Sequence, residues 1–275
     1  MRKVVERVGT PRSFGRKAWF PLWGVSVLLV GAVVLAGTAQ AVPIEYGSRV
    51  GTSVRYDEIR EDSPTDAPPL YGAPTIIGDL LDFNPPSFGS SSSGAAGVDV
   101  TDGTLSFDIH ALQGNFIDAI SIHESGDFTL TGTGGVNTMA AVQANIFIDI
   151  IEIDGHAPTQ ALNVIGSMAF APSNGDWNLR DDGPGPIVSG TWTGSFSLDV
   201  NAFLAERGEP FVGGVTGARF AMDNLLMTLS ELGTSATVGK KDVDVLGITV
   251  IPEPASGGLL GLGLLGLALR RSRRH

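Results

Sequence analysis

The stretch VQANIFIDIIEI at residues 142–153 decides the fold class of this chain. From Val142 to Ile150 every second residue is apolar, so these side chains share one face of an extended chain. Ile151 and Ile153 then take the opposite phase. A change of phase inside one long apolar run predicts a β-bulge at this point. The stretch therefore predicts one long, half-buried β-strand.

The same two-residue period recurs in the rest of the chain. Leu105, Phe107 and Ile109 alternate with polar residues, as in a strand that is buried on one face. Further strands are expected at residues 120–122, 127–133, 161–171, 187–200, 218–229 and 243–251. A short helix is expected at residues 201–207, with Gly208 closing it. Many short strands without a regular helical pattern between them indicate an all-β fold, and we expect one antiparallel β-sandwich that is jelly-roll-like.

Three other segments are expected to interrupt the strands. Residues 42–74 are polar and proline-bearing, which predicts an irregular entry segment, with one edge strand as an option. Residues 84–97 are rich in Pro, Ser and Gly, which predicts a loop. Glu124-Ser125-Gly126 is typical of a hairpin turn and would separate two short strands.

The N-terminal residues have the three parts of a secretory signal. Residues 1–17 carry six basic side chains, residues 19–36 are apolar, and Ala39-Gln40-Ala41 has small residues at the two positions that a signal peptidase requires. We expect a signal helix, export through the Sec translocon and cleavage after Ala41. The alternative is an uncleaved N-terminal anchor.

The C-terminal residues also form a three-part pattern. The motif Pro252-Glu253-Pro254 precedes an apolar run at residues 255–269. As a transmembrane helix this run would span about 22 Å at roughly 1.5 Å per residue. It is short for a permanent anchor, since a hydrocarbon core is about 30 Å thick. The stop-transfer arginines, which would lie on the cytoplasmic side, are Arg270, Arg271, Arg273 and Arg274.

This order of a Pro-Glu-Pro motif, a Gly/Leu-rich run and an arginine cluster resembles the PEP-CTERM sorting signal of Gram-negative bacteria. The resemblance covers about a tenth of the chain. It implies that exosortase, a membrane-embedded enzyme similar to cysteine proteases, cuts near residues 252–254. The protein would then be anchored transiently in the inner membrane and end at the cell surface or outside the cell. The alternative is an ordinary single-pass anchor.

The sequence therefore predicts three parts: a signal peptide at residues 1–41, an exported β domain at residues 42–250 and a sorting signal at residues 251–275. The β domain has eight basic and 27 acidic residues, a net charge near −19. This charge argues against nucleic acid as a partner, because phosphates require Lys and Arg. It suits a soluble exported protein or one that binds divalent cations. The chain has no cysteine, which excludes disulfides, thiolate metal sites and cysteine nucleophiles.

No catalytic set is recognisable in the sequence, and we expect no enzyme activity. No histidine pair has zinc-ligand helix spacing, and there is no G-x-S-x-G nucleophile motif. His110 and His123 fall on the polar phase of expected strands. Trp177 and Trp192 are expected in the core, although exposed tryptophans could stack on sugar rings.

Two weak ligand signals remain, and no cofactor is expected. The strand that contains Asp223 and Asn224 resembles a strand of exported carbohydrate-binding sandwiches, although such residues usually mark a bulge or a strand end. Aspartates cluster in expected turns, where they either bind calcium or simply form the turns; they are Asp99 and Asp102, and Asp176, Asp181 and Asp182. The metal, if any, is not identified by this pattern.

These observations lead to one functional expectation and two alternatives. We expect an exported protein that exosortase processes and that has a non-enzymatic structural or binding role in the exopolysaccharide matrix. Its partners would be signal peptidase, the Sec translocon, exosortase, the membrane before processing, and extracellular polysaccharide. The first alternative is a calcium-dependent carbohydrate-binding module, and the second is a polysaccharide hydrolase, which would need two facing carboxyl groups.

Overall fold

The computed structural model describes residues 42–248, apart from residues 134–135 and 184. The predicted signal helix and the predicted transmembrane helix lie outside the described residues. Within the described part of the chain, no helix combines the length and the apolar character needed to cross a membrane.

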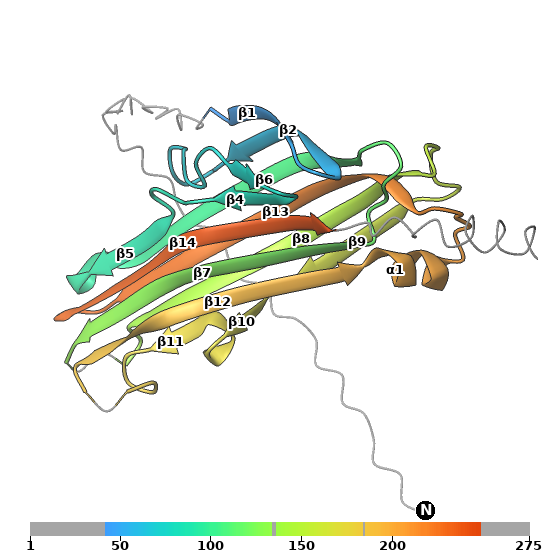
Figure 1. Cartoon of the computed structure of the whole chain (residues 1–275). Helices are drawn as coiled ribbons and strands as arrows, with labels where there is room; N and C mark the ends of the chain where they lie inside the picture. The colour runs from blue at the N-terminus through green and yellow to red at the C-terminus, as the bar shows by residue number, and fades with distance from the viewer. Residues whose placement is uncertain (1–41, 134–135, 184, 249–275) are drawn as a thin grey trace, which may run out of the picture. The chain divides into compact units, whose positions relative to one another are not determined.

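The strands form two seven-stranded sheets, and every pairing among the described residues is antiparallel (Figure 1). In the first sheet the order is β1-β2-β6-β13-β8-β11, and β9 also pairs with β8. Its strands are β1 (Ile44–Val50), β2 (Val54–Asp62), β6 (Gly97–Ala111), β8 (Met139–Ile153), β9 (Leu162–Ser167), β11 (Asp176–Asn178) and β13 (Val215–Ser230).

In the second sheet the order is β10-β12-β7-β14-β4-β3, and β5 also pairs with β14. Its strands are β3 (Thr75–Ile77), β4 (Leu80–Phe83), β5 (Gly89–Ser93), β7 (Ala119–Gly132), β10 (Ala169–Ala171), β12 (Ile187–Asp199) and β14 (Thr234–Ile248). The short helical turns are η1 (Gly94–Ala96) and η2 (Ser173–Gly175), and the one α-helix of the described residues is α1 (Val200–Arg207).

The long strands alternate between the sheets along the chain. β6, β8 and β13 belong to the first sheet, whereas β7, β12 and β14 belong to the second. Consecutive long strands therefore lie in opposite sheets instead of pairing with each other as hairpins. The expected antiparallel β architecture is confirmed, and the jelly-roll assignment stays a prediction.

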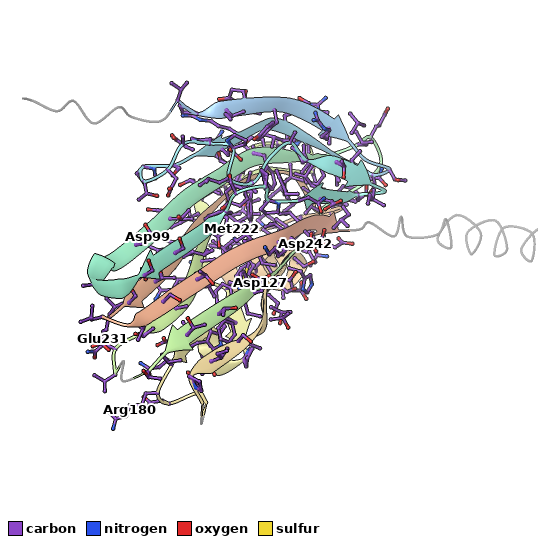
Figure 2. The ribbon with its side chains drawn as sticks, turned by 90° about the vertical axis from the view of Figure 1, so that its left-hand side faces the viewer. Asp99, Asp127, Arg180, Met222, Glu231 and Asp242 are labelled. Carbon is purple, nitrogen blue, oxygen red and sulfur yellow. The ribbon has the colours of Figure 1, made fainter. Side chains whose placement is uncertain are left out.

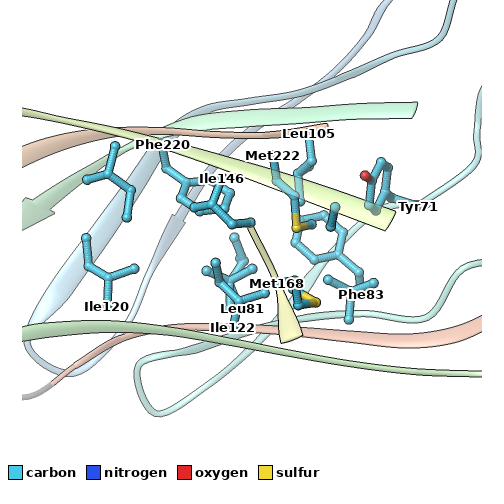
Figure 3. Close-up of a cluster of buried hydrophobic side chains, with 14 of the residues drawn as sticks. Tyr71, Leu81, Phe83, Leu105, Ile120, Ile122, Ile146, Met168, Phe220 and Met222 are labelled. Carbon is cyan, nitrogen blue, oxygen red and sulfur yellow. The ribbon is translucent and has the colours of Figure 1, made fainter. Parts of the chain in front are cut away.

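The inward faces of the two sheets share one hydrophobic core. Leu105, Ile146 and Phe220 come from the first sheet, while Leu81 and Ile122 come from the second, and all five are fully buried (Figure 3). Burying apolar surface at about 25 cal/mol per Å² is the main favourable term in such a fold. This core therefore stabilises the domain without disulfides.

The β-bulge expected in the opening stretch is confirmed. Opposite β13, the pairing passes from Ile153 and Glu152 directly to Ile150, so Ile151 has no partner in this register. Asp154 and Gly155 then form the expected turn with positive φ values of 50° and 78°. The bulge allows Ile150 and Ile153, three positions apart, to be buried together.

The expected short helix is also confirmed as α1. The carboxylate of Asp199 accepts a hydrogen bond from the backbone N–H of Ala202 at 2.8 Å, which caps the N-terminus. Gly208 adopts the left-handed conformation, φ 66°, and ends the helix. One side of the helix is buried through Val200 and Leu204.

The prediction of a turn at residues 124–126 is wrong, because β7 continues through these residues without a break. Gly126 is required there for close packing and not for a turn. A Cβ at this position would lie 2.5 Å from the ring of Trp192 and would overlap the carbonyl oxygen of Gly239. Glycine inside a strand can thus mark close approach of neighbouring groups.

Two segments expected to be mainly irregular contain more strand than expected. Residues 42–74 contain both β1, at the edge of the sheet, and β2, which lies inside it between β1 and β6. Residues 84–97 contain β5, in which Ser90 and Ser92 alternate with exposed serines as buried side chains. The hydroxyl of Ser90 lies 2.9 Å from that of Thr228 in the opposite sheet. Ser90 can therefore lie on the inward face of its strand because its hydroxyl finds a partner there.

Candidate functional site

A cluster of three polar side chains lies in the core between the two sheets. Lys240 on β14 contacts Glu124 on β7, with 2.5 Å between Nζ and Oε1. Asn224 on β13 donates from Nδ2 to the same oxygen at 2.8 Å. The side chains of Lys240 and Glu124 are 0% exposed, and Asn224 is 1% exposed. We call Lys240, Glu124 and Asn224 the buried triad.

Aromatic rings enclose the lysine of the buried triad. Nζ of Lys240 lies 4.8 Å from the ring centroid of Phe88 and 5.5 Å from that of Tyr71. Tyr71, at the edge of the cluster in Figure 3, accepts a hydrogen bond at 2.9 Å from Nδ2 of Asn224. Its own hydroxyl donates to the carbonyl oxygen of Gly103. The cation is therefore desolvated and held by one carboxylate and two ring faces.

Glu61 on β2 keeps Tyr71 in place. Its buried carboxylate accepts hydrogen bonds from the backbone N–H groups of Leu70, Tyr71 and Gly72, at 2.8, 2.9 and 3.1 Å. These three bonds hold the segment between β2 and β3 against the core, in which Leu70 and Tyr71 are buried. Glu61 thus acts on the buried triad indirectly, by positioning the tyrosine that contacts Asn224.

The triad leaves two polar atoms without partners among the described residues. They are Oε2 of Glu124 and Oδ1 of Asn224. Burial lowers the pKa of Lys240 to about 8, although the charge of Glu124 and their hydrogen bond oppose this change. A buried ion pair is costly to desolvate, and an unsatisfied acceptor adds to that cost.

The sequence contains a signal for this cluster, although no recognised motif includes it. Each member occupies an inward position of an apolar alternation: Glu124 follows Ile120 and Ile122, and Lys240 follows Ala236 and Val238. A charged residue in the apolar phase of a long strand is rare unless it is paired. The partners could not be matched, however, because they come from three different strands.

A second group consists of three carboxylates on the outward face of the second sheet. Asp82 on β4 and Asp242 and Asp244 on β14 place carboxylate oxygens within 4.8 Å of one another. Asp242 lies in the C-terminal half of β14 (Figure 2). Burial and then repulsion from neighbouring carboxylates raise the pKa of Asp242 and that of Asp244. Such oxygen ligands suit a hard divalent cation like Ca²⁺.

A pair of carboxylates lies on the outward face of the first sheet. Asp102 on β6 neighbours Asp223 on β13, to which Thr104 donates at 3.3 Å. Burial, followed by the charge of Asp223 and a hydrogen bond to it, raises the pKa of Asp102 to about 6. Asp102 and Asp223, which the sequence suggested separately, therefore meet. Asn224 points into the core, where an external ligand does not reach it.

The other aspartates proposed for calcium do not converge in the described structure. Asp99 lies within β6, and its carboxylate accepts from the backbone N–H of Ser91 at 2.7 Å. Asp182 accepts from the backbone N–H of Asn178, while Asp176 is exposed on β11.

The two histidines and the two tryptophans considered in the sequence lie on the faces that their strand patterns indicated. His123 is exposed and His110 is half-buried, in keeping with the polar phase of their strands. Trp177 and Trp192 are each 1% exposed, so both belong to the core, as expected. The ring of Trp177 stacks on Phe128 of the opposite sheet at a centroid distance of 4.1 Å. The sorting and signal-cleavage residues lie outside the described residues.

The comparisons with known proteins bear on the C-terminal residues. No curated protein matches this chain. Among solved structures, it is similar to the VP2 subviral particle of infectious bursal disease virus at 13% identity over 81% of this chain and 60% of that chain; the TM-score of 0.14 supports no statement on fold or function. Residues 250–274 match the family model of the PEP-CTERM protein-sorting motif. This protein therefore carries a PEP-CTERM sorting motif, which marks it as an exported substrate of exosortase.

Proposed function

We propose that this protein is a non-enzymatic component of the exopolysaccharide matrix. The Sec translocon exports it, signal peptidase cleaves it after Ala41, and residues 255–269 hold it transiently in the inner membrane. Exosortase then releases or transfers it at the cell surface. The observation that carries this proposal is the sorting motif at residues 250–274.

The described domain supports a structural or binding role. Its two sheets enclose one continuous core, and its net charge near −19 favours solubility outside the cell. Its two groups of outward carboxylates lie on opposite sheets, so each face offers oxygen ligands to cations that could bridge acidic polysaccharides.

The sorting motif supplies the first prediction. In a host with a working exosortase, we expect Glu253→Ala to accumulate as the unprocessed form, because the recognition tripeptide loses its only charge. The intact mass of the purified protein measures this. Glu206→Ala, which removes an exposed carboxylate from α1, serves as the control and is expected to be processed like the wild type. Normal loss of the tail from Glu253→Ala would contradict a recognition role for the tripeptide.

A second candidate function is calcium-dependent carbohydrate binding, and the group Asp82, Asp242 and Asp244 favours it. We expect Ca²⁺ to raise the thermal midpoint of the wild type and not that of Asp242→Asn, with a chelator reversing the effect. Asp176→Asn is the control, because this exposed aspartate lies on the other sheet. Glycan-array binding that a chelator abolishes would support the full proposal, and an array without signal would contradict it.

A further inference from the structure

We propose that Lys240 and Asn224 form an intramolecular isopeptide bond, with Glu124 transferring the protons. The bond would join Nζ of the lysine on β14 to Cγ of the asparagine on β13. It would connect the two sheets covalently through the core. This inference rests on the geometry of the buried triad and is independent of the proposed function.

The contacts place the reacting groups around one carboxylate oxygen. Oε1 of Glu124 lies 2.5 Å from Nζ of Lys240 and 2.8 Å from Nδ2 of Asn224. The nitrogen that must lose protons and the nitrogen that must leave with one therefore share the same acceptor. A group within hydrogen-bond reach of both atoms can serve as base and then as acid.

The surroundings favour the neutral forms that this reaction needs. Lys240, Glu124 and Asn224 lie at 0–1% exposure, with aromatic rings of Phe88 and Tyr71 beside the lysine. Moving one proton from Nζ to the carboxylate would replace the buried ion pair by two neutral groups and so remove two buried charges. Tyr71 holds the amide of Asn224 by a hydrogen bond at 2.9 Å. Water is kept away from the amide, which protects it from hydrolysis.

The unpartnered acceptors fit the same reaction. Oε2 of Glu124 and Oδ1 of Asn224 have no hydrogen-bond partner among the described residues. A proton on the carboxyl group of Glu124 would supply a donor where both acceptors now lack one. Polarisation of the carbonyl by such a donor activates Cγ for attack.

The atoms and electrons balance without another reactant. A proton first moves from the ammonium of Lys240 to Glu124, and the lone pair of Nζ then forms a bond to Cγ of Asn224 while the carbonyl π electrons move to Oδ1. As the carbonyl re-forms, the Cγ–Nδ2 bond breaks and its electron pair stays on nitrogen. Glu124 gives its proton to Nδ2 and takes a second one from Nζ. The products are an amide, a protonated Glu124 and one molecule of ammonia.

The position of the bond suits an exported chain with no cysteine. It would close a loop from residue 224 to residue 240 and link β13 to β14 across the core. Among the described residues β14 is the last strand, so a force applied at the C-terminal end of the domain enters there. The bond would pass that force to the central strand of the opposite sheet.

A peptide map of the wild-type protein tests the bond. The full chain is exported, purified and digested under denaturing conditions with trypsin, which cleaves after Arg219, Lys240 and Lys241. Asn224 and Lys240 lie in the same tryptic peptide, residues 220–240. The bond would block cleavage after Lys240. We expect residues 220–241 as the main product, lighter by the mass of one ammonia, with fragmentation suppressed inside the loop from 224 to 240.

Matched variants separate the bond from other modifications. Lys240→Arg keeps the positive charge and the tryptic site but cannot form the amide, so we expect residues 220–240 at full mass. Lys241→Arg changes the exposed neighbouring lysine and is expected to keep the bond. Glu124→Gln removes the proton carrier and is expected to abolish it. Circular dichroism checks that each variant is folded. If a variant does not fold, the peptide map of the wild-type protein decides whether the bond exists.

Three results would overturn the proposal. The first is a wild-type peptide 220–240 at full mass. The second is loss of ammonia with normal cleavage after Lys240, which indicates that Asn224 has cyclised on its own backbone. The third is loss of water with a link from Lys240 to the peptide that contains Glu124, which assigns the bond to the wrong acyl group.

Discussion

At the residue scale, the absence of a side chain at position 126 is what lets Trp192 pack against β7. We expect Gly126→Ala to lower the free energy of unfolding by about 1–3 kcal/mol, because the added methyl group overlaps fixed backbone and ring atoms. Chemical denaturation measures the change. Gly185→Ala is the control, since a Cβ there meets nothing within 4 Å, and its effect is expected to stay within about 0.5 kcal/mol. Equal effects of the two substitutions would contradict the packing argument.

A substitution of Asp102, in contrast, is expected to increase the stability of the protein. Burial and the neighbouring Asp223 raise its pKa from 3.8 to about 6, so its ionisation costs stability as the pH rises through this interval. Asp102→Asn is therefore expected to have a higher thermal midpoint than the wild type at about pH 7, with the difference shrinking near pH 3. Asp176→Asn is the exposed control. A difference that does not depend on pH would rule out this electrostatic cause.

At the element scale, one carboxylate organises the segment between β2 and β3. Glu61 accepts three backbone hydrogen bonds and brings Tyr71 to the buried triad. We expect Glu61→Ala to cost about 3 kcal/mol or more in unfolding free energy, since each buried donor without an acceptor costs about 1–3 kcal/mol.

Limited proteolysis checks whether this loss is local. Residues 64–74 are expected to become the first cleavage site in Glu61→Ala. Glu61→Gln keeps one acceptor oxygen and should lie between the wild type and the alanine variant. An alanine variant with wild-type stability and wild-type cleavage would contradict the positioning role of Glu61.

At the scale of the whole molecule, two sets of carboxyl groups shape the pH dependence of stability. Burial tends to raise the pKa of Asp79 and of Asp154, but hydrogen bonds lower both pKa values below 3.8. Asp79 accepts from the hydroxyl and N–H of Ser53 and from the N–H groups of Val54 and Thr52. Asp154 accepts from the N–H groups of Val212, Gly214 and Gly213. The stability that these two aspartates contribute is fully present above about pH 3.8, and it is lost as the pH falls through their pKa values in the folded protein.

The carboxyl groups with raised pKa values have the opposite effect. Asp102, Asp242 and Asp244 reduce stability as the pH rises from 3.8 to their folded-state values. We therefore expect the thermal midpoint to be highest at about pH 5 and lower at about pH 3 and pH 8. Calorimetry over this range measures it. A thermal midpoint that keeps rising up to about pH 8 would show that the carboxyl groups with raised pKa values contribute little to the pH dependence.

The parts of the fold that the sequence predicted are those that local patterns encode. The bulge near Ile151 follows from a phase change, and α1 follows from Asp199 and Gly208 at its ends. β5 was missed because its inward residues are serines; the partners of the Ser90 hydroxyl lie on β6 and β13. The continuity of β7 was missed because Gly126 looked like a turn residue. The neighbouring sequence does not distinguish a glycine that forms a turn from a glycine that makes room for an aromatic side chain.

By itself, the sequence determined the β class, most strand positions and the sorting motif, because alternation and tripartite tails depend only on neighbours along the chain. Only the tertiary structure decided which strands face each other, and hence that Glu124, Asn224 and Lys240 meet. Contacts between strands 100 residues apart leave no periodic trace, as the pair Asn224 and Glu124 shows. The buried triad is therefore a property of the packed sheets, since three sequence segments contribute one residue each to a space that exists only after folding.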